Sequence, residues 1–234
     1  MKYLCIVFIL FCTSLWAASP VELLKKADDI RNPSDSFVMT VKVASPDEVI
    51  KESQFEVHIG GKDRTLIKTL APKINIGRNM LMLREDMFVF VPNLKRAVRV
   101  SLGQKLTGEA ANGDIARTRW SEDYDVIQEK TEKIDSDYYA VLYLTANKKG
   151  LTYERIRLWI SLSSFRPLKS QYMTPENKVL KTCDFKGYAH MAGAIRPLVL
   201  EIRDAVSSRS STITITQMKK ENYPESYFAK ENLE

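Results

Sequence analysis

The sequence predicts a mainly β protein: an unclosed antiparallel β-barrel of about ten or eleven strands, with an N-terminal helix and a short helical lid insert. Most of the chain consists of short segments in which apolar and polar residues alternate, separated by turn-forming residues. No helix long enough for a parallel crossover lies between successive segments, so the sheet should be antiparallel. Some strands are apolar on both faces, which requires a cover on each side of the sheet.

The first residues have the three parts of a secretory signal peptide. One lysine precedes the apolar run Leu4–Phe11, and the small residues Ala17 and Ala18 follow. The run is shorter than the ~20 residues that a transmembrane helix needs. We therefore expect a signal peptide over residues 1–17, with cleavage after Ala17 or Ala18 and an uncleaved anchor as the alternative. The mature chain would be a single exported domain over residues 18–234.

The mature chain opens with a helix and continues with strands. Apolar residues recur at helical spacing in the segment Val21–Arg31. The first strand follows at Ser36–Ser45, where every second residue is apolar. The pair Gly60-Gly61 predicts a hairpin turn between the second and third strands. Further strand segments reach to Met218, and a short helix should follow Pro224.

A long insert interrupts the strand pattern. The segment Gly103–Asp125, which we call the insert, contains three glycines, short polar residues and a Trp, without strand alternation. The strands before it, Met80–Leu83 and Met87–Val91, are apolar on both faces. One face would lie on the sheet's own core, and a helix or a ligand would cover the other. Because a structureless loop of this length is uncommon and usually functional, we interpret the insert as a lid, with an ordinary surface loop as the alternative.

The sequence lacks the patterns of catalytic or metal-binding chemistry. The histidines His58 and His190, and Cys183, the only cysteine after residue 17, have no zinc-ligand spacing. No nucleophile elbow, phosphate-binding loop or dinucleotide fingerprint occurs. We therefore predict a non-enzymatic protein without metal, cofactor or internal disulfide. The net charge of +6 favours anionic partners such as lipid head groups, and the lack of a basic cluster in the sequence argues against nucleic acid.

Several short motifs occur between Ile76 and Val126. They are Gly77-Arg78-Asn79-Met80, Val91-Pro92, Arg96 to Arg99, Asn112-Gly113-Asp114, Ala116-Arg117-Thr118 and Asp123-Tyr124-Asp125. In these motifs the segment resembles the outer-membrane lipoprotein-sorting protein family, which is related to the periplasmic lipoprotein carrier LolA. The later segment Leu158–Tyr172 is similar to the family's strand–turn–strand segment, so the resemblance covers most of the mature chain. It implies an unclosed antiparallel barrel whose helices plug or cover a hydrophobic cavity.

The resemblance and the apolar pattern together give two groups of candidate residues. Those expected to bind lipid or to form the lid are Met80, Met82, Phe88, Phe90, Leu106, Ile115, Trp120 and Trp159. Those expected to supply hinges and polar contacts of the lid are Arg78, Gly103, Gly108, Gly113, Asp114 and Arg117. Flexible methionines suit variable apolar ligands, and core filling is the alternative for each one. Either Arg117 or Arg119 would hold the closed lid, and the sequence leaves that choice open.

The implied function is carriage of acyl chains, from lipoproteins or other lipids, across the periplasm toward the outer membrane. An RND-type exporter in the inner membrane and an acceptor at the outer membrane are the expected partners, and a monomer is the expected state. The alternative is a non-catalytic periplasmic or surface interaction module on the same scaffold, such as a transporter accessory subunit or an adhesin. An apolar cavity under the insert would favour the carrier.

Overall fold

The computed structural model describes residues 18–33, 35–116 and 119–233. The expected signal peptide over residues 1–17, and Arg117 of the insert, therefore lie outside the described residues. Within the described part of the chain, no helix is both long and apolar enough to cross a membrane.

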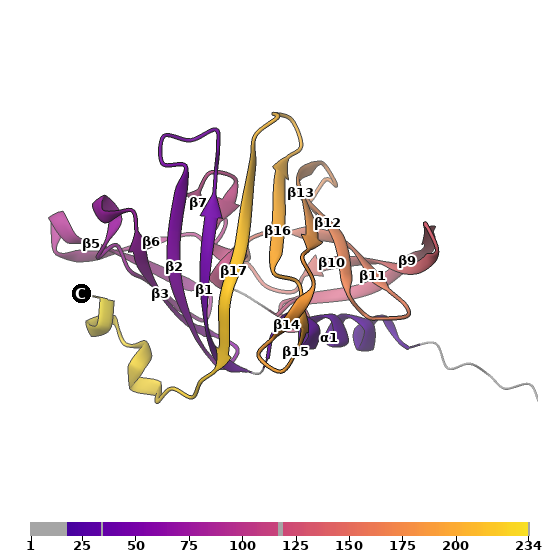
Figure 1. Ribbon diagram of the computed structural model, residues 1–234, viewed down its shortest axis with the longest axis horizontal. Coiled ribbons are helices and arrows are strands. Elements are labelled where there is room, and N and C mark those ends of the chain that lie inside the picture. The colour runs from indigo at the N-terminus through magenta and orange to yellow at the C-terminus, as the bar shows by residue number, and fades with distance from the viewer. Residues whose placement is uncertain (1–17, 34, 117–118, 234) are drawn as a thin grey trace, which may run out of the picture.

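Most of the chain forms one antiparallel sheet of 13 strands (Figure 1). Its strands are β1 (Ser36–Ala44), β2 (Glu52–Gly60), β3 (Arg64–Ala71), β4 (Met80–Leu83), β5 (Asp86–Val91), β6 (Arg96–Val100), β9 (Tyr124–Ile134), β10 (Asp137–Ala146), β11 (Arg155–Ser161), β12 (Pro167–Met173), β13 (Val179–Lys186), β16 (Val199–Asp204) and β17 (Ser210–Lys220). The smaller elements are the paired strands β7 (Lys105–Thr107) and β8 (Ala110–Ala111), the pair β14 (Ala189–Met191) and β15 (Ala194–Arg196), helices α1 (Pro20–Arg31) and α2 (Asn112–Ala116), and the 3₁₀ helices η1 (Lys73–Asn75), η2 (Pro92–Leu94), η3 (Glu225–Phe228) and η4 (Lys230–Leu233).

The order of strands confirms the predicted fold class. Across the sheet it runs β6-β5-β4-β3-β2-β1-β17-β16-β13-β12-β11-β10-β9. The sheet bends strongly (Figure 1), yet its edge strands β6 and β9 are not neighbours in this order, so the barrel is unclosed. The main sheet holds 13 strands rather than the expected ten or eleven. Because β6 and β9 flank the insert in the chain, the insert connects one edge of the sheet to the other.

Helix α1 begins with a capping box. The Ser19 Oγ accepts a hydrogen bond from the Glu22 amide, and the Glu22 carboxylate accepts one from the Ser19 amide. Its residues Leu23, Leu24 and Ala27 are buried. The helix contacts β9, β11 and β15, so it packs on the sheet near the β9 edge (Figure 1). This confirms the helix predicted from the apolar spacing.

The main core lies on the inward-curving face of the sheet, which we call the concave face. In β1, every second side chain from Phe37 to Val43 belongs to this core, as the alternation predicts. The insert contributes to the same core through Ala110, Ile115 and Trp120. The insert therefore lies inside the curved sheet and packs as part of its interior.

A second, smaller core explains why β4 and β5 are apolar on both faces. On the outward, convex face, Leu66 and Leu81 pack against Phe228 and Leu233 of the C-terminal 3₁₀ helices. Gly60 makes room for this packing, because a Cβ built there would lie 2.1 Å from the Phe228 ring. The second cover that the sequence requires for these strands is therefore the C-terminal segment.

Candidate functional site

A groove lies between the insert and the concave face of β2–β6. It has a volume of about 270 Å³, slightly below the usual range of about 300–1,000 Å³ for small-molecule pockets. The polar and cationic residues that line it include Asn75, Arg78, Gln104 and Lys105. Its apolar lining consists of Ile50, Phe55, Met80, Val89, Val100 and Leu106. An apolar surface beside two cations is suited to an amphipathic ligand.

The far end of the insert is fastened to α1 by a buried carboxylate. Asp28 is fully buried and accepts hydrogen bonds from the amide of Trp120 at 3.1 Å and from the amide of Ser121 at 2.8 Å. The Ser121 hydroxyl donates to it as well, and Arg31 lies 3.6 Å from its other oxygen. Burial raises the pKa of Asp28, although Arg31 and the three donors act in the opposite direction. We call this group of contacts the latch.

A second buried carboxylate holds the short helix α2. Asp114 accepts hydrogen bonds from the Ala111 amide at 2.8 Å and from the Tyr153 hydroxyl at 3.0 Å. The Tyr153 ring stacks on Tyr172 with 3.9 Å between the ring centroids. Burial raises the pKa of Asp114. The predicted polar role of Asp114 therefore corresponds to a structural contact that ties α2 to the strands of the β9 side.

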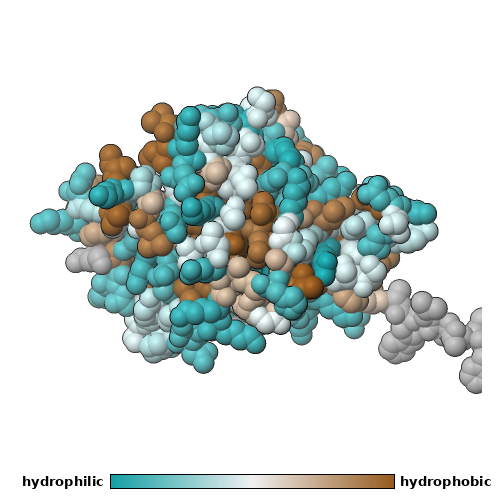
Figure 2. All heavy atoms as spheres, in the orientation of Figure 1, coloured by the Kyte–Doolittle hydropathy of each residue, from teal (hydrophilic) through white to brown (hydrophobic). Residues whose placement is uncertain are grey.

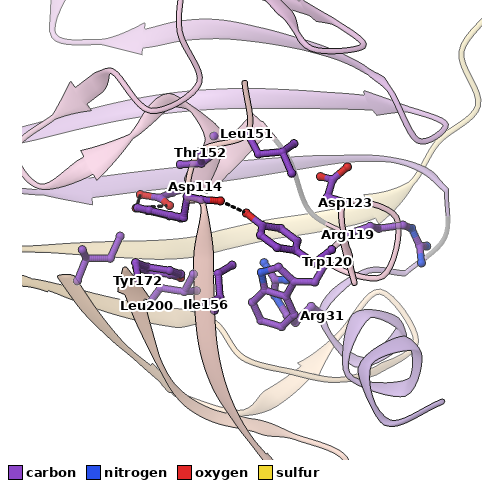
Figure 3. Close-up of a pocket in the computed structure, with 14 residues that line it drawn as sticks. Arg31, Asp114, Arg119, Trp120, Asp123, Leu151, Thr152, Ile156, Tyr172 and Leu200 are labelled. Atoms are coloured by element: carbon purple, nitrogen blue, oxygen red, sulfur yellow. Dashed lines mark hydrogen bonds between the residues drawn. The ribbon is translucent and has the colours of Figure 1, made fainter. Parts of the chain in front are cut away.

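Figure 3 shows the space around these contacts, where Arg31 lies against Trp120. The Arg31 guanidinium carbon is 3.7 Å from the Trp120 ring centroid, a cation–π arrangement. The pocket has a volume of only about 30 Å³, which is room for about one or two water molecules. The β9 side of the interior is therefore filled, in contrast to the groove.

Ion pairs and hydrogen bonds of Glu109 hold the part of the insert that contains β7 and β8. Glu109 is buried, and one of its oxygens lies 3.0 Å from Lys105 Nζ and 2.6 Å from an Arg209 nitrogen. Burial disfavours ionisation of Glu109, yet hydrogen bonds from Arg209 and Lys105 hold its pKa below the usual value. The Lys181 ammonium donates to the Glu109 carbonyl, and the Glu109 amide donates to Ser211 Oγ at 2.8 Å.

The insert glycines lie where another chain segment comes close. A Cβ on Gly113 would be 1.7 Å from Thr152 Oγ1, and one on Gly103 would be 3.3 Å from the Thr152 carbonyl. Gly108 has a φ of +54° and faces Ser45 and Ser211, with a distance of 2.1 Å from its ideal Cβ to Ser45 Oγ. Close packing thus accounts for these glycines in the closed arrangement, and a hinge role stays a prediction.

The structure divides the predicted lipid-binding residues into three groups. Met80 and Leu106 line the groove, with Arg78 beside them. Met82, Ile115 and Trp120 are buried in the core that the sheet and the insert share. Phe88, Phe90 and Trp159 lie on the convex face, away from the groove.

The placement of this third group corrects the expectation that these residues share a cavity with Met80. Phe88 and Phe90 alternate with the core residues of β5 and pack toward the C-terminal segment, because successive side chains of a strand point to opposite faces. The Trp159 indole donates to Glu132 at 3.3 Å, and Lys169 lies 4.7 Å from its ring centroid.

The polar residues give a partial answer about which arginine holds the insert. Arg119 pairs with Asp29 at 3.4 Å and with Asp35 at 3.0 Å, so it ties the insert to α1 and to the segment after it. Arg117 lies outside the described residues.

Sequence reasoning missed the latch residue Asp28 and the groove residues Val89 and Val100. The alternation in β5 and β6 could have identified both valines, whereas nothing in the sequence marks Asp28.

These features define a class of protein: an unclosed antiparallel half-barrel whose interior holds a packed insert and an apolar groove. A LolA superfamily protein from Nitrosomonas europaea has a crystal structure with 33% sequence identity to this chain and a TM-score of 0.87, covering 92% of this chain and 100% of that chain. The chain belongs to the LolA superfamily. A family model described only as an uncharacterized protein matches residues 61–234. No curated protein sequence matches the chain.

Two further solved structures share the fold at lower identity. A domain named for outer membrane lipoprotein sorting, from Vibrio parahaemolyticus, is 19% identical with a TM-score of 0.75, covering 92% of this chain and 97% of its own. A DUF1329 family protein from Desulfovibrio piger is 19% identical with a TM-score of 0.76, covering 93% of this chain and 100% of its own. At this identity, the likeness shows the fold alone.

Proposed function

We propose that this protein carries the acyl chains of lipoproteins or of other lipids through the periplasm. The observation that supports this most strongly is the groove of about 270 Å³ between the insert and β2–β6, with apolar walls and with Arg78 and Lys105 in its lining. The superfamily and the structural relative named for lipoprotein sorting agree with this role. The predicted signal peptide supports export to the periplasm.

The groove provides apolar surface on which an acyl chain can be shielded from water. Each methylene group moved out of water contributes about 0.8 kcal/mol, and Phe55, Met80 and Leu106 provide apolar surface for it. The volume suits part of a chain. A longer chain needs more space, which the insert would provide by moving away from β2–β6. The closed arrangement is then the empty carrier, in which the insert takes the place of cargo.

The cations of the lining fit the other end of the ligand. Arg78 is exposed, and the Lys105 side chain is 51% exposed although its ammonium pairs with Glu109 at 3.0 Å. Both cations can therefore approach an anionic or strongly polar head group. The inner-membrane exporter and the outer-membrane acceptor stay predictions that the resemblance supports. A monomer suffices for this mechanism, because one chain supplies the whole groove.

Mass spectrometry of lipids that co-purify with the protein from its native envelope tests this proposal. We expect bound acyl lipid in the wild-type protein and less in Leu106→Asp, which places a carboxylate in the groove. Leu180→Asp is the matched control, since Leu180 is 40% exposed on β13 and does not line the groove. Absence of lipid, together with failure to bind a fluorescent fatty acid, would favour the alternative of a protein-interaction module.

A further inference from the structure

Two adjoining turns form an exposed corner at one end of strands β3–β6, and we call residues 72–78 and 92–96 the corner. The first turn joins β3 to β4 and contains η1, and the second joins β5 to β6 and contains η2. Neither 3₁₀ helix has a buried residue. The turns are neighbours in space, because a Cβ built on Gly77 would lie 3.3 Å from Cγ of Pro92.

The corner presents apolar side chains to water. Ile74 is 82% exposed, Ile76 is 53% exposed and Leu94 is 55% exposed. Figure 2 shows apolar side chains standing out from the surface at the upper left, over the loop between β1 and β2 and over the turns beside β5. A single exposed leucine is ordinary, but three large aliphatic side chains on two adjoining turns form an apolar tip of the kind that marks an interaction site.

The apolar tip is surrounded by positive charge. Residues 64–108 contain nine Lys and Arg, and their two acidic residues, Glu85 and Asp86, lie at the β4–β5 turn, at the opposite end of these strands. Four of the cations are exposed in the corner itself: Lys73, Arg78, Lys95 and Arg96.

The corner cations are also free of the ion pairs that neutralise their neighbours. Among the described residues, no carboxylate lies within ion-pair distance of Lys73, Lys95 or Arg96, whereas Arg99, further along β6, pairs with Asp86. Their charge is therefore available to a partner.

Other exposed apolar loop tips have the opposite surroundings. Val49 is fully exposed, but it follows Asp47 and Glu48 in the chain. Val206 is 84% exposed, and its amide donates to the carboxylate of Asp204 at 3.0 Å. Only the corner, among these tips, combines aliphatic side chains with unpaired cations and no acid.

The corner also reaches the groove, because Asn75 and Arg78 belong to both. A ligand that leaves the groove past Arg78 therefore emerges at the corner. A surface that sits at this opening is well placed to receive or to deliver an acyl chain.

We propose that the corner docks the protein on an anionic lipid bilayer, with Ile74, Ile76 and Leu94 entering the interface and the cations resting among the head groups. Aliphatic side chains beside Lys and Arg are the composition that binds such surfaces. This inference rests on the proposed carrier function for its purpose, but it can be tested separately. It predicts reversible, salt-sensitive attachment, since charge attraction at a surface is screened within about 8 Å at physiological ionic strength.

Sedimentation of the mature chain with vesicles tests the docking. The probes are vesicles of phosphatidylcholine alone and vesicles of phosphatidylcholine mixed with phosphatidylglycerol. We expect binding to the mixed vesicles only. Lys73→Gln with Lys95→Gln should weaken it about 30-fold, because each basic residue near such a surface contributes about a fivefold factor. Ile74→Ser with Leu94→Ser should also weaken it, whereas Val49→Ser with Val206→Ser, which changes two other exposed tips, should leave it intact.

Three outcomes would overturn the proposal: no binding of the wild-type protein to the mixed vesicles, unchanged binding of both corner variants, or loss through the lysine changes alone. The last would assign the corner to charge attraction, as for an acidic protein surface. Binding of a fluorescent fatty acid in solution separates this test from the carrier function. Corner variants should keep that binding, and a protein that binds vesicles but no fatty acid would contradict the carrier while leaving the docking inference standing.

Discussion

The two sides of the sheet meet the insert in different ways. On the β2–β6 side, a groove of about 270 Å³ separates the insert from the strands. On the β9–β13 side, the pocket beside the insert has a volume of about 30 Å³. The buried polar anchors are also unequal. Asp28 and Asp114 tie the insert to α1 and Tyr153 near the β9 edge through carboxylates. On the other side, the bonds go to backbone carbonyls: Thr65 Oγ1 donates to Ala116 at 2.9 Å, and Asn112 Nδ2 donates to Ser101 at 3.0 Å.

The unequal anchoring indicates which side of the insert can move away from the sheet. Apolar contacts have no fixed direction, so an acyl chain can replace them at little cost. Buried hydrogen bonds to carboxylates cannot be given up so readily, because the groups left behind have no water to replace the lost partner. We therefore expect the insert to stay fastened at the β9 side and to move away from β2–β6 when cargo enters.

The largest effect should come from removing the latch. Asp28→Ala leaves the amides of Trp120 and Ser121 and the nearby Arg31 without this partner, which should lower the free energy of unfolding by about 3 kcal/mol. Urea unfolding measures it. Asp29→Ala is the control, since the Asp29 side chain is 59% exposed, and it should change stability by less than about 0.5 kcal/mol. Equal effects of the two variants would remove the basis for calling the β9 side the fixed one.

A smaller change is expected at Asp114, and it should depend on pH. Burial raises the pKa of Asp114 above its unfolded value of about 3.9, so the folded protein keeps this proton to higher pH than the unfolded chain. The stabilising contribution is complete below about pH 4 and is lost as the pH rises through the folded pKa. Asp114→Asn keeps the side chain's shape and removes the titration. Its free energy of unfolding relative to wild type should increase as the pH rises from about 4.

Unfolding curves of both proteins across that pH range give this difference directly, and the contribution of Asp28 cancels because both proteins contain it. A relative stability that falls as the pH rises would mean that the ionised carboxylate is the stabilising form. Asp114 would then hold α2 as an ionised carboxylate and not as a protonated one.

Filling the groove should reduce binding more modestly. Leu106→Trp occupies space that about two methylene groups of a ligand would use, which costs about 1.6 kcal/mol, or roughly a 15-fold loss of fatty-acid affinity. Titration with a fluorescent fatty acid measures it. Leu180→Trp, on the far part of the sheet, should bind as wild type does. Unaltered affinity in Leu106→Trp would place the ligand outside the groove.

The smallest effect is expected at the mouth of the groove. Arg78→Gln removes an exposed cation whose attraction to an anionic head group is partly screened by water, so fatty-acid affinity should fall about threefold. The same substitution should not affect a neutral acyl ester. A comparison of the two ligands by titration therefore isolates the charge, and an equal loss for both would assign Arg78 a role in shaping the groove instead.

The sequence predicts the sheet well and the interior only in part. Alternation in β1 places Phe37, Met39, Val41 and Val43 on the core face, and the structure agrees. The double apolar pattern of β5 correctly signals two covers. It cannot say that the C-terminal Phe228 supplies one of them, because that contact joins segments far apart in the chain.

The same limit explains the candidate residues that lie elsewhere. If the insert is taken as the cover of β5, Phe88 and Phe90 are expected to face the cavity. The structure places them on the convex face, where they pack toward the C-terminal segment. The latch carboxylate Asp28 looks like any acidic residue of an amphipathic helix. The corner cations Lys73 and Lys95 are twenty-two positions apart in the sequence, so only folding brings their charges together.

Photo-crosslinking with a diazirine-labelled fatty acid would show where an acyl chain binds in the curved sheet. After irradiation of the mature protein, mass spectrometry of its peptides locates the adducts. We expect adducts on the groove residues of the β2–β6 side and on β7, at Phe55, Met80, Val100 and Leu106. Adducts concentrated on the β9–β13 side, around Tyr153 and Tyr172, or no adducts at all, would contradict this expectation.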